Sequence, residues 1–133
     1  MFSFNESIHL KIKEIAKKLF KLEKEVGNEV GLNRSETQVI SFLADKNNLT
    51  HTEIVSMCES DKAAISRVLT NMEKKGLIES NHEENNKKTL HAKLTETGEK
   101  VAQNLKTVFE KCFNKYFGKL SKKDKEAIKN LAL

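Results

Sequence analysis

Apolar residues recur at helical spacing near the N-terminus of the chain. Six aliphatic residues follow one another at steps of four, three, four, three and four: Ile8, Ile12, Ile15, Leu19, Leu22 and Val26. This spacing places them in one stripe along a helix, with Lys and Glu on its other faces. Gly27 follows the stripe, and glycine often ends helices, so we expect this helix to end there.

Residues that cap helices occur at five later positions in the chain. They are Ser35, Thr50, Asp61, Thr95 and Ser121. Gln38 and Glu53 follow the first two caps at the spacing of a capping box, in which the side chains of both residues satisfy backbone N–H groups. The caps predict helices over about 35–45, 50–58 and 62–75, and two more that begin after residues 95 and 121.

Two segments between these helices have the mixed apolar and polar character of short strands. They cover residues 77–80 and 88–94, and the polar stretch NHEENNK separates them. Polar, turn-forming residues between two strands favour a β-hairpin with a long tip.

The C-terminal part of the chain repeats the pattern of a long amphipathic helix. Its stripe holds Val101, Leu105, Val108 and Cys112, and aromatic residues lie beside it: Phe109, Phe113, Tyr116 and Phe117. Ala127, Ile128 and Leu131 belong to a short last helix. The predicted fold is therefore mainly α with a small β-hairpin, in the order α-α-α-α-β-β-α-α, and 133 residues suffice for one domain.

Composition and charge narrow the classes of function. The net charge of +5 and the pI of about 9.1 are compatible with a nucleic-acid partner. No apolar run approaches the roughly 20 residues of a membrane helix, and the N-terminus lacks the apolar core of a signal peptide, so we expect a cytoplasmic protein. The motifs of a phosphate-binding loop, a nucleophile elbow and a metalloprotease are missing, so we expect neither an enzyme nor a cofactor.

The cysteines and histidines do not form a recognisable metal site. Cys58 and Cys112 have neither zinc nor disulfide-framework spacing, and the four histidines are scattered over different elements. We expect no metal. Both cysteines are expected to be buried and inert, although a redox-responsive regulator using Cys58 or Cys112 stays open as an alternative.

Three short helices followed by a hairpin describe a winged helix-turn-helix, whose second motif helix lies in the DNA major groove. In the helix over 62–75, Ile65, Val68, Leu69 and Met72 share an inward face. The opposite face carries small or hydrogen-bonding residues without an acid: Lys62, Ala63, Ser66, Arg67, Thr70 and Asn71. Arg67 can pair with a guanine edge and Asn71 with an adenine edge. A solvated face on a structural helix is the competing interpretation.

Several segments of the sequence resemble the MarR family of bacterial transcription regulators. The likeness runs from about Leu32 to Gly98 and is strongest over DKAAISRVLTNMEKKGLIES at 61–80. LTETG at 94–98 resembles the motif that follows the family's wing, and L-x-x-S-x-x-Q at 32–38 resembles the start of its second helix.

The resemblance implies a homodimer that binds a pseudo-palindromic operator in double-stranded DNA and responds to a small effector. Residues 1–133 would form one such domain, with a DNA-binding lobe over about 32–98 and dimerisation helices over about 5–27 and 95–133. It implies a recognition-helix role for the outward residues of 62–75, with Asn71 at the edge of that surface. Contacts to the DNA backbone are expected from the start of the preceding helix, at Thr50, His51 and Thr52.

The expected wing differs from the family pattern of an aspartate followed by an arginine. The aligned residues here are Asn86, Lys87 and Lys88, after two glutamates. Lysine binds phosphate but is a poorer probe of the minor groove than arginine, so we expect the wing to add backbone affinity. Alternatively, the tip of the hairpin is only solvated and does not contact DNA. The whole protein would then be a winged-helix module that binds protein instead of DNA.

The two long helices are expected to form the dimer interface. A monomer would expose a large apolar patch on them. The residues expected at the interface are Ile8, Ile12, Ile15, Leu19, Phe109, Phe113, Tyr116 and Phe117. The N-terminal stripe could instead belong to the core of a single chain.

Overall fold

The computed structural model of the chain describes residues 1–58, 60–83 and 86–133, together with their side chains except those of 83 and 86–88. The helices are α1 (Phe4–Val30), α2 (Arg34–Asp45), α3 (His51–Met57), α4 (Lys62–Lys74), α5 (Glu96–Phe117) and α6 (Lys122–Lys129). The strands are β1 (Leu49–Thr50), β2 (Ile78–Glu83) and β3 (Asn86–Leu94). The mainly helical fold with a hairpin between α4 and α5 is therefore confirmed.

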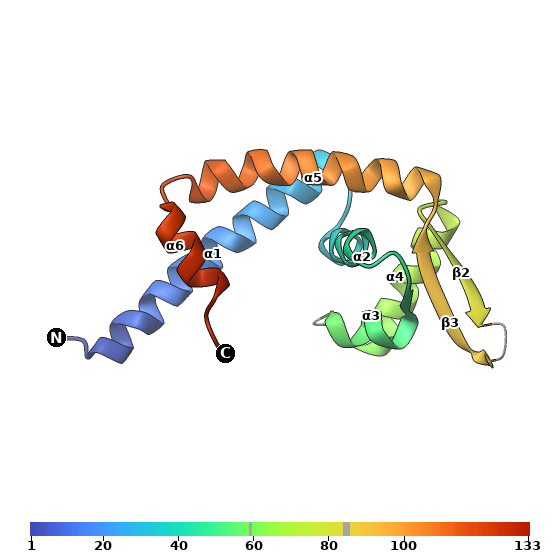
Figure 1. Cartoon of the computed structure of the whole chain (residues 1–133), viewed down its shortest axis with the longest axis horizontal. Coiled ribbons are helices and arrows are strands. Elements are labelled where there is room, and N and C mark those ends of the chain that lie inside the picture. Colours follow the sequence, from blue (N-terminus) through green and yellow to red (C-terminus); the bar gives the residue numbers. More distant parts are fainter. Residues whose placement is uncertain (59, 84–85) are drawn as a thin grey trace.

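The helix α5 joins the two ends of the molecule (Figure 1). At one end it lies along α1, with α6 and both chain termini nearby. At the other end, α2, α3, α4 and the β2–β3 hairpin form a compact lobe. Among the described residues, none of the helices combines the length and the apolar character that crossing a membrane requires.

A three-stranded antiparallel sheet lies in this lobe, in the order β1-β3-β2. The hairpin strands pair from Ile78 with Leu94 at their base to Glu83 with Asn86, with an irregularity between His82 and Glu83. The strand β1 was not predicted from the sequence. It has two residues, and it exists because Leu49 and Thr50 pair with β3, more than 40 residues later in the chain.

One hydrophobic core holds the lobe together and continues between α1 and α5. Its buried residues in the lobe include Val39, Ile40, Leu43, Leu49, Ile54, Ile65, Leu69, Met72 and Ile78. Leu22 and Val26 of α1 and Leu105, Cys112 and Phe117 of α5 extend the same core. Only the last third of the predicted α1 stripe is thus buried within the chain.

Four of the five predicted caps are confirmed. Thr50 and Glu53 form a capping box on α3, and Asp61, Thr95 and Ser121 accept backbone N–H groups of α4, α5 and α6. The capping box predicted for Ser35 and Gln38 is wrong. Asn33 and Glu36 form it instead, two residues earlier, because an Asn with a Glu three residues later has the same capability.

The predicted end of α1 at Gly27 is also wrong. The helix continues to Val30 and ends at Gly31, which has a φ of 74°. Gly27 has a different role, since a Cβ there would lie 2.7 Å from the carbonyl oxygen of Leu32. The Leu32 N–H donates to the Gly27 carbonyl (2.9 Å), so the turn after α1 folds back tightly onto the helix.

Candidate nucleic-acid interface

The helix α4 separates its residues into two faces, as the sequence predicts. Ile65, Leu69 and Met72 are buried in the lobe, and Val68 is half-buried. The six outward residues are all exposed: Lys62, Ala63, Ser66, Arg67, Thr70 and Asn71. Their exposure leaves this face accessible to a partner, while their contact with DNA stays a prediction.

The chemistry of the outward face comes from Arg67 with small neighbours. Within the described part of the chain, the structure shows no hydrogen bond or ion pair for the Arg67 side chain, so its donors face solvent. Thr70 Oγ1 donates to the Ser66 carbonyl of the preceding turn (2.9 Å). The hydroxyl of Thr70 therefore acts outward mainly as an acceptor. Asp61 places one carboxylate at the helix start, where it accepts from the Ala64 N–H (2.8 Å).

The start of α3 presents the residues predicted to contact the DNA backbone. Thr52 is exposed, and Thr50 and His51 are half-buried. Thr50 Oγ1 is already an acceptor for the Glu53 N–H (3.0 Å). Of the three, Thr52 is the residue with the most accessible side chain.

His51 connects α3 to the hairpin, a role that the sequence did not indicate. Its Nε2 lies 3.0 Å from Ser80 Oγ of β2. On the neighbouring strand, His91 Nδ1 lies 3.2 Å from Asn48 Oδ1, just before β1. These two contacts hold the hairpin against the start of α3 and the segment just before it. No local spacing pattern could have revealed them, since 29 and 43 residues separate the partners.

The protonation of His51 responds to this environment. Burial lowers the pKa of its imidazole, and the neighbouring His91 lowers it further, while the carboxylate of Glu73 acts in the opposite direction. The ring is therefore more difficult to protonate than a histidine in water.

The predicted wing residues lie in the hairpin at its far end (Figure 1). The backbone of Asn86, Lys87 and Lys88 belongs to β3. The prediction of a long polar tip over residues 81–87 is wrong, because β2 continues to Glu83 and β3 begins at Asn86. Their side chains lie outside the described part of the structure, so their contact with phosphate stays a prediction.

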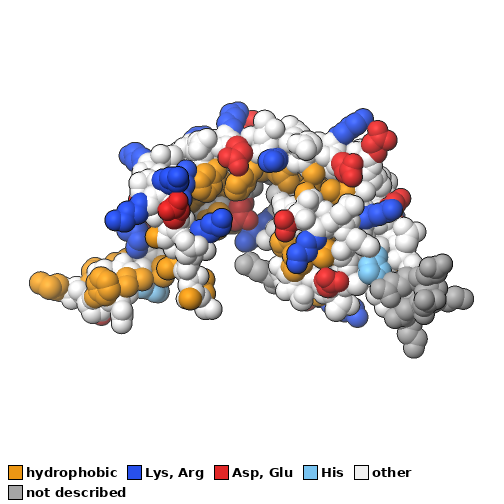
Figure 2. Space-filling model, in the orientation of Figure 1, with side chains coloured by type: hydrophobic (Ala, Val, Ile, Leu, Met, Phe, Trp, Pro, Cys, Tyr) orange, Lys and Arg blue, Asp and Glu red, His pale blue; other side chains and the backbone are white. Residues whose placement is uncertain are grey.

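The residues predicted at a dimer interface divide into two groups. Ile8, Ile12, Ile15, Leu19 and Phe109 are exposed, each by at least 39 %. Figure 2 shows hydrophobic side chains at the surface around the N-terminal part of α1. In contrast, Phe117 is buried within its own chain, and Phe113 and Tyr116 are half-buried. Three phenylalanines lie in a row, with ring centroids 5.8 Å apart for the stacked pair Phe109–Phe113 and 5.3 Å apart for the tilted pair Phe113–Phe117.

Two ion pairs connect α1 to α5 beside this aromatic row. Lys115 Nζ lies 2.7 Å from Glu25 Oε1, and Lys111 Nζ lies 2.9 Å from Glu29 Oε1. The thiol of Cys112 contacts Glu29 Oε2 at 3.8 Å. Burial raises the pKa of the Cys112 thiol, and the two carboxylates raise it further. Cys112 is buried as predicted, whereas Cys58 is only half-buried. Its partial burial still raises the pKa of the Cys58 thiol, so both cysteines favour the less reactive thiol form.

A large cavity lies between the two ends of the molecule. Its volume is about 1110 Å³, and its walls come from α1, α2 and α5. Apolar side chains such as Leu22, Phe42 and Leu105 line it together with polar ones such as Gln38 and Gln103. Among the described residues, no group of three or more His, Cys, Asp or Glu side chains could hold a metal ion.

Comparisons with known proteins agree with this geometry. The profile of the MarR family matches residues 32–90, which include α2, α3, α4 and most of the hairpin. The transcriptional regulator HosA of Escherichia coli is 26% identical over 100 residues, which are 75% of this chain and 74% of HosA.

Two solved structures have the same fold at low sequence identity. A mutant of E. coli MarR in complex with operator DNA has a TM-score of 0.75 and 18% identity, over 97% of this chain and 94% of that one. BpsR of Bordetella bronchiseptica, whose DNA binding is regulated by 6-hydroxynicotinic acid, has a TM-score of 0.78 and 16% identity, over 96% and 91% of the two chains. The matched segment 32–90, which contains the capped α4 and most of the hairpin, makes this part of the chain similar to the MarR family, and the whole chain shares the fold of its solved members.

Proposed function

We propose that this protein is a transcription regulator that binds a specific sequence in double-stranded DNA. The observation that carries the proposal is the outward face of α4, where Arg67 projects without a partner among the described residues and small side chains surround it. Small neighbours let the helix approach the bases, and the guanidinium can donate two parallel hydrogen bonds to a guanine edge. The complex of an E. coli MarR mutant with operator DNA supports DNA binding by a protein of this fold.

Selection of binding sites from a random double-stranded DNA pool tests the proposal. The wild-type protein should enrich an inverted repeat. Arg67→Ala should bind it about 1–3 kcal/mol more weakly for each half-site contact and with relaxed base preference. A pool without enrichment, at a salt concentration where specific complexes persist, would refute specific binding and favour a winged-helix module that binds protein.

Two further variants separate base reading from simple charge. Arg67→Lys keeps the positive charge and removes the bidentate geometry, so it should also relax the base preference. Lys74→Ala removes a charge from the last residue of the same helix and should leave the preference unchanged. Equal base preference in the Arg67→Lys variant and the wild type would show that Arg67 acts only as a charge.

We propose that the active form is a homodimer, held by the exposed apolar residues of α1 and by the aromatic part of α5. An inverted repeat requires a second copy of α4, which a two-fold dimer supplies. Light scattering should give a mass of about 30 kDa, twice the 15.2 kDa of one chain. A mass near that of one chain at micromolar concentration would contradict the dimer.

The chain offers a matched pair of variants for the dimer. Ile12 and Leu10 are both exposed, by 59 % and 46 %, and they lie on opposite faces of α1. Ile12→Glu should dissociate the dimer because it places a charge within the apolar stripe. Leu10→Glu should leave it intact, and dissociation by both variants alike would argue against the stripe as the interface.

We also propose that a small anionic or aromatic effector binds in the cavity between α1, α2 and α5. Its apolar side chains suit an aromatic ring, and Lys100 and Lys106 could pair with an anionic group, although four carboxylates line the cavity as well. The regulation of BpsR by 6-hydroxynicotinic acid supports the idea of an effector, without naming one for this chain.

Because the proposed target is DNA, we place the protein in the cytoplasm. We divide its single domain into a DNA-binding lobe over about 32–98 and dimerisation helices over about 5–27 and 95–133.

A further inference from the structure

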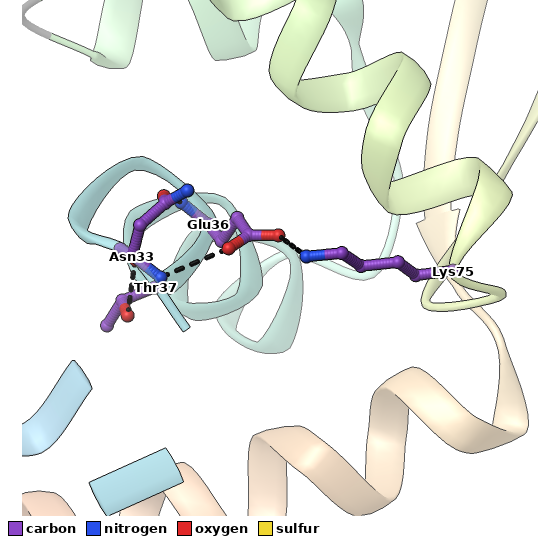
Figure 3. A network of polar contacts seen from close by, with 4 residues as sticks. All are labelled: Asn33, Glu36, Thr37 and Lys75. Atoms are coloured by element: carbon purple, nitrogen blue, oxygen red, sulfur yellow. Dashed lines mark hydrogen bonds and ion pairs between the residues drawn. The ribbon is translucent and has the colours of Figure 1, made fainter. Parts of the chain in front are cut away.

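One charged side chain is buried where α2 meets α4. Among the described residues, Glu36 is the one charged residue that is buried, with 4 % of its surface exposed. It belongs to the first turn of α2, and both of its carboxylate oxygens are used (Figure 3). Burial of a carboxylate is costly unless its hydrogen bonds are satisfied, so these contacts need an explanation.

The first carboxylate oxygen holds the start of α2. Glu36 Oε1 accepts from the Asn33 N–H (3.1 Å), and Asn33 Oδ1 accepts from the Glu36 N–H (2.9 Å). This capping box follows directly on the tight turn at Gly31 and Leu32, which is hydrogen-bonded back to Gly27 of α1. The position of Glu36 is therefore tied to the end of α1.

The second carboxylate oxygen reaches the recognition helix. Lys75 Nζ donates to Glu36 Oε2 at 2.7 Å, and Lys75 is the residue that caps the C-terminus of α4. In Figure 3 the lysine extends from the end of α4 across the gap to α2. The ion pair between Glu36 and Lys75 thus connects the end of α4 to the start of α2, and through the capping box to the end of α1.

The end of α4 has one further support. The Thr95 hydroxyl donates to the Gly76 carbonyl, and the Thr95 N–H donates to the Leu77 carbonyl at 3.1 Å. These bonds hold the turn after α4 against the start of α5. Apolar packing of Leu69 and Met72 also holds this end of α4 in the core, but such packing is not directional. The ion pair is the polar contact that fixes the angle of α4 relative to α2.

We propose that Glu36 and Lys75 are positioning residues for DNA reading, which fix the orientation of α4 relative to α2. The inference rests on the proposed DNA-binding function and extends it to residues that need not touch DNA. Lys75 is half exposed, so a direct contact between its ammonium and a phosphate is the rival explanation. The two explanations predict opposite effects for Glu36.

Glu36→Gln distinguishes them. Glutamine also functions at this position of a capping box, so the start of α2 is preserved, while the charge that holds Lys75 is lost. Removal of a negative charge from a DNA-binding protein favours binding to a polyanion. A rival role of Lys75 at phosphate therefore predicts equal or tighter binding by Glu36→Gln, whereas a positioning role predicts weaker binding to the operator.

The experiment measures binding to the sequence that the wild-type protein selects and to unrelated DNA of equal length. Glu36→Gln and Lys75→Met should each bind the selected sequence about tenfold more weakly, the loss expected if α4 is correctly oriented for about a tenth of the time. Binding to unrelated DNA should change little. The double variant should lose no more than either single variant, because both remove the same contact.

Three control variants accompany this comparison. Lys75→Arg keeps the ion pair and should retain wild-type binding. Lys74→Met removes a neighbouring charge that has no ion pair among the described residues, and Glu53→Gln makes the same substitution in the capping box of α3. Neither should reduce the ratio of specific to non-specific affinity. The thermal unfolding of each variant is measured, and binding is compared only at temperatures at which all variants are folded.

Two results would overturn the inference alone. One is a Glu36→Gln variant that binds the selected sequence as tightly as the wild type. The other is a Lys75→Met variant whose loss extends equally to unrelated DNA and lowers the salt dependence, as expected for a lost phosphate contact. A wild-type protein that selects no sequence would instead refute the proposed function itself.

Discussion

Gly98 offers a quantitative test of how α5 is joined to the DNA-binding lobe. It is buried in the first turn of α5, where a Cβ would lie 2.0 Å from the Leu77 carbonyl oxygen and 3.2 Å from Leu94 Cδ2. The Leu77 oxygen cannot move freely, since it accepts from the Thr95 N–H at 3.1 Å. Gly98→Ala must therefore displace either the turn after α4 or the start of α5.

The effect of Gly98→Ala on the free energy of unfolding is the sum of favourable and unfavourable contributions. Alanine favours a helix over glycine by about 1 kcal/mol. Overpacking of a close contact costs about 1–3 kcal/mol. The weakened Thr95–Leu77 hydrogen bond costs about 1 kcal/mol more. We expect Gly98→Ala to lower the free energy of unfolding by about 1–3 kcal/mol.

Urea unfolding followed by circular dichroism measures this change. All variants need the same protein concentration, because the stability of a dimer depends on it. Thr97→Ala, at the exposed neighbouring position, should stay within about 0.5 kcal/mol of the wild type. An unchanged or raised stability of Gly98→Ala would mean that helix propensity dominates and that the close approach to Leu77 is not a constraint.

Two other predictions concern the wing and His51. Replacement of Lys87 and Lys88 by alanine should weaken binding to all DNA sequences alike and lower the salt dependence by about one unit for each lost phosphate contact; a changed base preference, measured by site selection, would contradict this role. Because the pKa of His51 lies below its ordinary value of 6.5, the unfolded chain binds a proton there more readily than the folded one. Stability should therefore fall as the pH falls below about 6.5, and this part of the pH dependence should vanish in His51→Gln; unfolding curves between pH 5 and 8 that are identical in shape for both proteins would rule it out.

The elements that the sequence predicted best depend on local chemistry. Asp61 and Thr95 each serve a backbone N–H only three residues away, so a short segment contains all the information needed. The same locality explains the error at Ser35. Two overlapping segments have residues that can form a capping box, and in the structure Asn33 and Glu36 form it.

The features that the sequence did not predict depend on partners far along the chain. Glycine ends helices and also permits close approach of backbones, and only the fold shows that Gly27 does the second. The contact of Glu36 with Lys75 spans 39 residues, and nothing near either residue indicates the other. The outward face of α4 was predictable because its periodicity is local, whereas its proposed contact with DNA depends on a second molecule and stays a prediction.

The separation of the two faces of α4 has a consequence for how such a regulator diversifies. The residues that hold the helix in the lobe, such as Ile65 and Leu69, are different from those that face outward, such as Arg67 and Thr70. Substitutions on the outward face therefore leave the core packing unchanged. Under the proposed role of this face in DNA binding, a duplicated copy would acquire a new target sequence through a few changes there without passing through an unstable intermediate.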